Sequence, residues 1–95
     1  MATLEISYWA GTAQQGGNVP GRILASEAVT LSGSSAQSGV APAGADLVSI
    51  LATGTPARFE IGANPTAGAA SAYLAANERI WMTAQPGARI AGISA

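Results

Sequence analysis

The chain has 95 residues, of which 48% are hydrophobic and 9% are charged, and its formal net charge is -1. This length fits one small domain and leaves no room for a second. Alanine supplies nearly half of the apolar residues, so few large side chains remain to form a core. We therefore expect the domain to gain support from self-association or from docking on a partner.

The chain contains no histidine, cysteine or lysine, and this absence excludes several kinds of site. Without cysteine there is no disulfide, thiolate nucleophile or structural zinc site, and without histidine there is no imidazole base. Four arginines against five acidic residues give no basic surface for nucleic acid. The sequence shows neither a signal peptide nor an apolar stretch of membrane-spanning length, so we expect neither nucleic acid nor a membrane as a partner.

The N-terminal part predicts one strand followed by an irregular segment. Over residues 3–9, the side chains of Leu4, Ile6 and Tyr8 alternate with polar residues and Trp9, which is typical of a half-buried strand. The glycine-rich segment 11–21 has no periodicity, and we expect a long loop or flexible arm there.

Further strands are expected along the rest of the chain, with turns rich in Gly, Pro and Ser between them. The segment 46–51 is nearly continuous in apolar residues, which favours a central strand covered on both faces. The alanine-rich segment 66–76 predicts either a short helical turn or an irregular strand around Tyr73 and Leu74. The other expected strands lie within residues 22–32, as one strand or two, and at 57–61, 78–83 and 88–93.

About six to eight short strands at this spacing predict an all-β fold. We expect a single β domain over residues 1–95, a small β-sandwich of jelly-roll-like or immunoglobulin-like type that forms oligomers. Residues 1–21 would be an N-terminal strand with a flexible arm.

No group of residues in the sequence has the pattern of a catalytic or metal site. The serines near residues 33–39 lack both the G-x-S-x-G turn and a base. The acidic residues form no cluster with calcium-loop spacing, and the sequence does not bring any two of them together. We expect a protein that is not an enzyme and that has no cofactor and no metal.

Trp9 and Trp81 are the most informative residues, because each falls on the strand face opposite the apolar alternation. An outward tryptophan either covers the end of a core or anchors an interface.

Four segments resemble, in order and spacing, a family of small virion proteins of tailed bacteriophages. The resemblance spans residues 29 to 93, and its segments are 29–38, 59–67, 74–78 and 86–91. It implies a structural protein of the particle, in particular a head decoration or cement protein that binds the major capsid protein on the outer surface of the capsid. It further implies a homotrimer that is made in the bacterial cytoplasm and ends up in the virion.

The family supplies no contact residues, so the interface is predicted from physical chemistry. The hypothesis is that the segment 11–21 and five apolar side chains contact the capsid or neighbouring protomers; these side chains are Leu4, Ile6, Tyr8, Trp9 and Trp81. Two other functions stay open. One is another virion component, in the tail or at the head-tail junction, and the other is a carbohydrate- or receptor-binding β-sandwich in which Trp9 or Trp81 stacks on a sugar.

Overall fold

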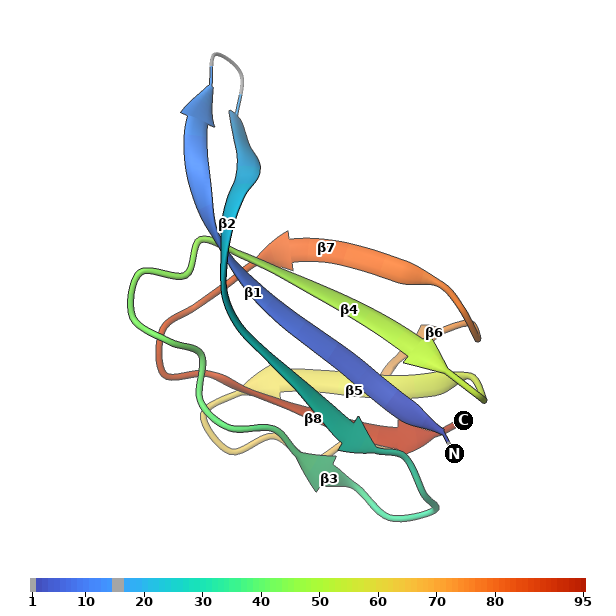
Figure 1. The fold of residues 1–95 in the computed structure, drawn as a ribbon. Coiled ribbons are helices and arrows are strands. Elements are labelled where there is room, and N and C mark those ends of the chain that lie inside the picture. The colour runs from blue at the N-terminus through green and yellow to red at the C-terminus, as the bar shows by residue number, and fades with distance from the viewer. Residues whose placement is uncertain (1, 15–16) are drawn as a thin grey trace.

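The structure is a computed structural model that describes residues 2–14 and 17–95, with side chains described for residues 2–10 and 22–95. The chain forms a small β-sandwich of two four-stranded antiparallel sheets (Figure 1). The first sheet has the strand order β2-β1-β4-β7, and the second has the order β3-β8-β5-β6. The strands are β1 Thr3–Gln14, β2 Gly17–Thr30, β3 Ala36–Gln37, β4 Leu47–Thr53, β5 Ala57–Gly62, β6 Ala72–Leu74, β7 Arg79–Thr83 and β8 Arg89–Ser94.

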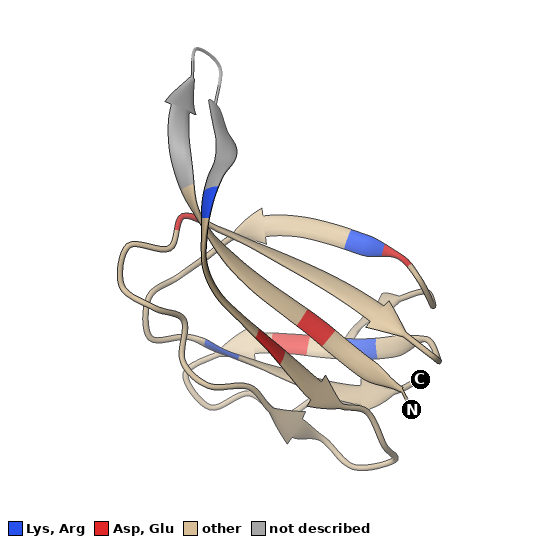
Figure 2. Cartoon of the chain, in the orientation of Figure 1, with Lys and Arg blue, Asp and Glu red and all other residues tan. Residues whose placement is uncertain are grey.

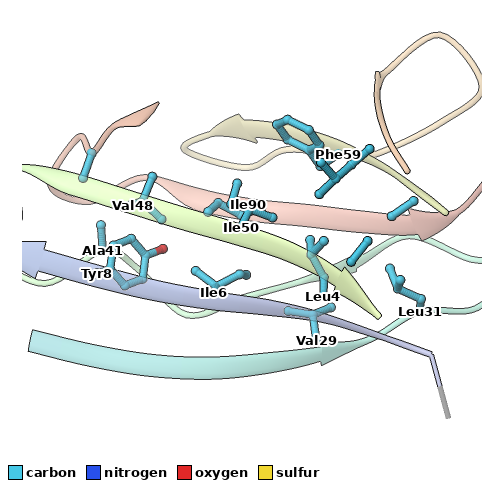
Figure 3. Close-up of a cluster of buried hydrophobic side chains, with 14 of the residues drawn as sticks. Leu4, Ile6, Tyr8, Val29, Leu31, Ala41, Val48, Ile50, Phe59 and Ile90 are labelled. Atoms are coloured by element: carbon cyan, nitrogen blue, oxygen red, sulfur yellow. The ribbon is translucent and has the colours of Figure 1, made fainter. Parts of the chain in front are cut away.

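The core lies between the two sheets and follows the period-2 alternation of the strands (Figure 3). Leu4, Ile6 and Ile50 of the first sheet have exposed fractions of 0%, 1% and 0%, and they face Phe59 and Ile90 of the second sheet. Successive side chains of a strand point to opposite faces, so every second residue enters the core. The predicted all-β sandwich and the inward and outward faces of its strands are therefore confirmed.

Gly92 of β8 allows the two sheets to approach closely. A Cβ atom at this position would lie 3.0 Å from Leu4 Cδ2 and 3.2 Å from Leu31 Cδ2. Any larger residue would push these buried leucines aside, because core side chains are packed without spare volume.

The glycine-rich segment 11–21 is not the loop that the sequence predicts. Its described residues, 11–14 and 17–21, are strand, and they pair in a hairpin from Gly11 opposite Pro20 to Gln14 opposite Gly17. The paired ends of β1 and β2 project beyond the sandwich (Figure 1). A strand with no core beneath it needs no apolar alternation, so periodicity gave no signal there. Register shifts between Tyr8 and Trp9 and between Ala10 and Gly11 mark where the hairpin leaves the sandwich.

Two open alternatives are decided by the structure. The segment 66–76 contains the short strand β6 and no helix, because the completely buried Leu74 is needed in the core, which overrides the helix propensity of alanine. Residues 22–30 belong to the single strand β2 rather than to two strands. The described residues contain no helix with the length and hydropathy to span a membrane.

Candidate functional site

The outer face of the first sheet is the strongest candidate for a functional surface, because it gathers an unusual set of side chains. Ser49 in the middle of β4 lies opposite Trp81 of β7 and opposite Ser7 of β1. Residues opposite one another in an antiparallel pair share a face, and diagonal neighbours lie within reach of long side chains. Trp9 and Arg79 are such diagonal neighbours of Ser49. We call Trp9, Ser49, Arg79 and Trp81 the tryptophan cluster.

Hydrogen bonds to one hydroxyl hold the tryptophan cluster together. Trp9 Nε1 donates to Ser49 Oγ at 3.3 Å, and Arg79 Nη1 donates to the same oxygen at 2.9 Å. The rings of Trp9 and Trp81 lie 5.7 Å apart, centroid to centroid, and are tilted by 49°. Ser49 is completely buried beneath these side chains, whereas 47% of Trp81 is exposed. The cluster is therefore a fixed aromatic platform with one open ring.

Hydroxyl side chains lie on the same outer face as the tryptophan cluster, and Leu47 and Leu51 flank Ser49 along β4. Thr3 and Thr53 are 2.6 Å apart, oxygen to oxygen, and Ser7 and Ser26 are 3.2 Å apart. By the strand registers, Glu5 and Arg79 are the charged residues on this face of β1, β4 and β7. Charged residues are few along these strands (Figure 2). Such a surface carries few charges, as the centres of protein interfaces do.

The outer face of the second sheet differs, because the chain's own segment 63–71 lies over part of it near β3, while Glu60 and Tyr73 on the same face stay exposed. Gln37 Nε2 donates to Asn64 Oδ1 at 2.9 Å and to the carbonyl oxygen of Pro65 at 2.7 Å. The amide of Ala67 donates to Ser35 Oγ at 2.9 Å. Pro65 and Ala67 are buried in this way.

The five predicted interface residues separate into two groups. Leu4, Ile6 and Tyr8 point into the core and are at most 3% exposed, so they offer no surface to a partner. The prediction that these three form an interface is wrong, because the apolar side of β1 packs on the second sheet of its own chain. Trp9 and Trp81 lie on the outer face, where contact with a partner stays a prediction.

Sequence reasoning missed Ser49 and Arg79. Ser49 lies within the apolar stretch of β4 and is small enough to be taken for a core residue. Its contacts with Trp9 and Arg79 depend on the register between strands, which cannot be read from the sequence. The position of Arg79 could have been predicted in part. It lies two residues before Trp81 on the same strand, so the two side chains share one face of the sheet.

Tyr8 is the one described residue with a buried side-chain polar atom that lacks a hydrogen-bond partner. The neighbouring Ser38 hydroxyl donates instead to the carbonyl oxygen of Gly39 at 2.8 Å. Burial raises the pKa of Tyr8 above its ordinary value of 10.0, and the negative charge of Glu27 adds to this rise. A cavity of about 10 Å³ lies beside the ring, which is too small for a ligand beyond about one water molecule.

Four acidic side chains accept hydrogen bonds from nearby hydroxyl or amide groups: Glu5 from Thr3, Glu27 from Gly39, Glu60 from Ser71 and Glu78 from Ala75. Within the part of the chain that the structure describes, no three acidic residues lie together as metal ligands would. The absence of catalysis, cofactor and metal stays a prediction.

Comparison with known proteins returned no match among family models, curated proteins or solved structures. The resemblance to phage virion proteins therefore depends on the sequence segments between residues 29 and 93.

Proposed function

We propose that this chain is a structural virion protein that binds the outer surface of a tailed-phage head and stabilises it. The observation that carries the proposal is the tryptophan cluster on the outer face of the first sheet. Its Trp81 ring is 47% exposed and lies 5.7 Å from the ring of Trp9, centroid to centroid. Tryptophan and arginine are enriched among the residues that contribute most to binding at protein interfaces.

The role requires surface contact and no chemistry. A decoration protein buries surface across neighbouring copies of the major capsid protein, so the shell cannot come apart without breaking those contacts. Several linked contacts give a strong attachment even when each is weak. Such a protein acts as a homotrimer in the virion, and contact with partners supplements a core rich in alanine.

The paired ends of β1 and β2 offer a second contact, because they project beyond the sandwich (Figure 1). A two-stranded hairpin is at best marginally stable in water by itself, so a partner surface would support it.

Replacing residues 11–21 by a two-residue Asn-Gly turn tests this contact and keeps β1, which lies between β2 and β4 in the first sheet. We expect the shortened protein to fold and to occupy fewer sites on the heads. Undiminished occupancy would remove the hairpin from the interface.

Cryo-electron microscopy of decoration-free phage heads mixed with the purified protein tests the proposed function. We expect density in groups of three at the local three-fold positions of the shell. Density confined to the tail vertex would assign the protein to the tail or the head-tail junction, and absence of density would reject a virion surface role.

A sugar-binding function is the second candidate, and the open ring of Trp81 beside Arg79 and a row of hydroxyl groups favours it. Aromatic rings stack on the apolar faces of sugars, while arginine donates to hydroxyl groups. Tryptophan fluorescence during titration with a panel of glycans separates the two functions. A saturable change with one glycan, together with no binding to heads, would favour the sugar-binding module.

A further inference from the structure

We propose that Ser49 is the positioning residue of the tryptophan cluster, and that Arg79 binds a carboxylate which the capsid protein presents beside an apolar side chain. The second half of this inference rests on the proposed function. It names the chemistry of the partner at the same surface.

The first step is that the hydrogen bonds of the Ser49 hydroxyl come from side chains on the outer face of the sheet and not from core residues. Ser49 is completely buried on the outer face of β4, where an apolar residue of similar size would need no hydrogen bond. A buried hydroxyl is costly unless it is hydrogen-bonded. The Ser49 oxygen accepts from Trp9 Nε1 and Arg79 Nη1, so one atom fixes the orientation of both side chains.

The second step is that this fixation benefits binding. A long arginine side chain and a tryptophan ring lose rotational freedom when they enter an interface, and holding them beforehand reduces that loss. The hydroxyl therefore prepares the outer face of the first sheet for a partner, although Ser49 itself is too buried to contact one.

The third step concerns the charge of the partner. A guanidinium has five N–H donors, and the hydrogen bond recorded for Arg79 goes to a neutral oxygen. The acidic residues close to it in register and sequence each have a hydrogen-bond partner, since Glu5 accepts from Thr3 and Glu78 accepts from the amide of Ala75. Arg79 is exposed, so its other donors are available to a carboxylate, which arginine binds in a two-point geometry.

The fourth step is the apolar half of the site. The exposed ring of Trp81 lies opposite Ser49 and next to Arg79 along β7. A partner that fits both groups carries an aspartate or glutamate next to an apolar side chain. The positive charge of Arg79 favours an acidic protein surface of this kind over a neutral sugar.

Two variants test the inference, and two controls accompany them. Ser49→Ala removes the shared acceptor, and Arg79→Gln removes the cation. Ser26→Ala is the matched control for loss of a hydroxyl on the same face, because Ser26 is exposed and contacts Ser7. Arg79→Lys keeps the charge without the planar fork.

The first measurement uses the free protein. Near-ultraviolet circular dichroism reports the coupling of the two tryptophan rings, and thermal unfolding reports the fold. We expect Ser49→Ala to change the tryptophan signal and Ser26→Ala to leave it unchanged. An unchanged signal in a folded Ser49→Ala protein would overturn the positioning role of Ser49.

The second measurement is binding to decoration-free heads over a series of salt concentrations. We expect Ser49→Ala and Arg79→Gln each to bind about tenfold or more weakly, since a hydrogen bond to a charged group has an effect of this order. Arg79→Lys should recover part of the affinity, and the salt dependence should fall in Arg79→Gln.

Two outcomes of the binding measurement would contradict us in different ways. If the wild-type protein binds heads and both variants bind equally well, the roles assigned to Ser49 and Arg79 are wrong while the decoration role stands. If the wild-type protein does not bind heads, the proposed function fails, and with it the carboxylate partner of Arg79. The tryptophan signal of the free protein still decides the positioning role in that case.

Discussion

The outer faces of the two sheets differ in which side chains and segments of the chain lie on them. On the second sheet, residues 63–71 cross the strands and are held by Gln37, which donates to Asn64 and Pro65. On the first sheet, Trp9 and Trp81 pack on one another and Trp81 stays 47% exposed. The second sheet also presents an open aromatic ring, the 54% exposed Tyr73 beneath Arg58, so the two faces differ in how the ring is held rather than in whether one is exposed.

Both faces depend on one core, so the largest expected effect is Leu4→Ala. Leu4 is completely buried, and removal of its side chain leaves a cavity between the sheets. We expect the free energy of unfolding to fall by about 2–5 kcal/mol, measured by urea denaturation. Thr30→Ala at an exposed position of β2 is the control and should change stability by less than about 0.5 kcal/mol. A similar small loss for Leu4→Ala would contradict the packing of β1 on the second sheet.

Trp81→Ala and Tyr73→Ala compare the two faces directly, because each removes a half-exposed aromatic ring. Trp81 is 47% exposed on the first sheet, and Tyr73 is 54% exposed on the second, beneath Arg58. We expect Trp81→Ala to weaken binding to phage heads by about 2–4 kcal/mol, the range of an interface hot spot. Tyr73→Ala should leave binding unchanged. Equal losses in the two variants would remove the distinction between the faces.

Gln37→Ala should uncover part of the second sheet. The substitution removes the hydrogen bonds to Asn64 and Pro65, and we expect about 1–2 kcal/mol lower stability. Amide hydrogen exchange at Ala67 should become faster, because the segment 63–71 loses an attachment. Gln85→Ala in an exposed turn is the control. Unchanged exchange at Ala67 would show that other contacts hold this cover.

The smallest expected effect concerns the pH dependence of stability at Tyr8. Burial raises the pKa of this phenol above 10.0, so the folded state binds the proton more tightly than the unfolded state. Its contribution to stability is therefore complete below about pH 10 and is lost as pH rises through the raised pKa. We expect Tyr8→Phe to flatten this alkaline loss in chemical denaturation.

At neutral pH, Tyr8→Phe should change stability by no more than about 1 kcal/mol, because the hydroxyl has no hydrogen-bond partner to lose. Tyr73→Phe on the second sheet is the matched control, since that ring is exposed. The same alkaline loss in both variants would disprove the assignment to Tyr8.

The fold could be predicted from the sequence where one face of a strand is buried. Alternation identified β1, β5 and β7, and the position of a turn before β8 agrees with the positive φ of 83° at Gly87. Alternation alone did not say what lies against the apolar face, so Leu4, Ile6 and Tyr8 were assigned to a partner instead of the core. The hairpin at 11–21 gave no periodic signal because no core lies beneath it.

The candidate site was predictable only in part. The outward position of Trp9 and Trp81 follows from strand periodicity, but their contact depends on β4 lying between β1 and β7. Ser49 is 40 residues from Trp9 and 30 from Arg79 along the chain. A single sequence does not contain the register that joins such distant residues, because register is set by the packing of the whole sheet.

The close approach at Gly92 constrains how this protein can vary. A Cβ atom there would meet the ends of Leu4 and Leu31, so the residues tolerated at positions 4, 31 and 92 depend on one another. In a library randomised at all three positions, we expect folded clones with alanine at 92 to carry a smaller residue at 4 or 31. A substitution in β1 would then be tolerated only together with a matching substitution in β8.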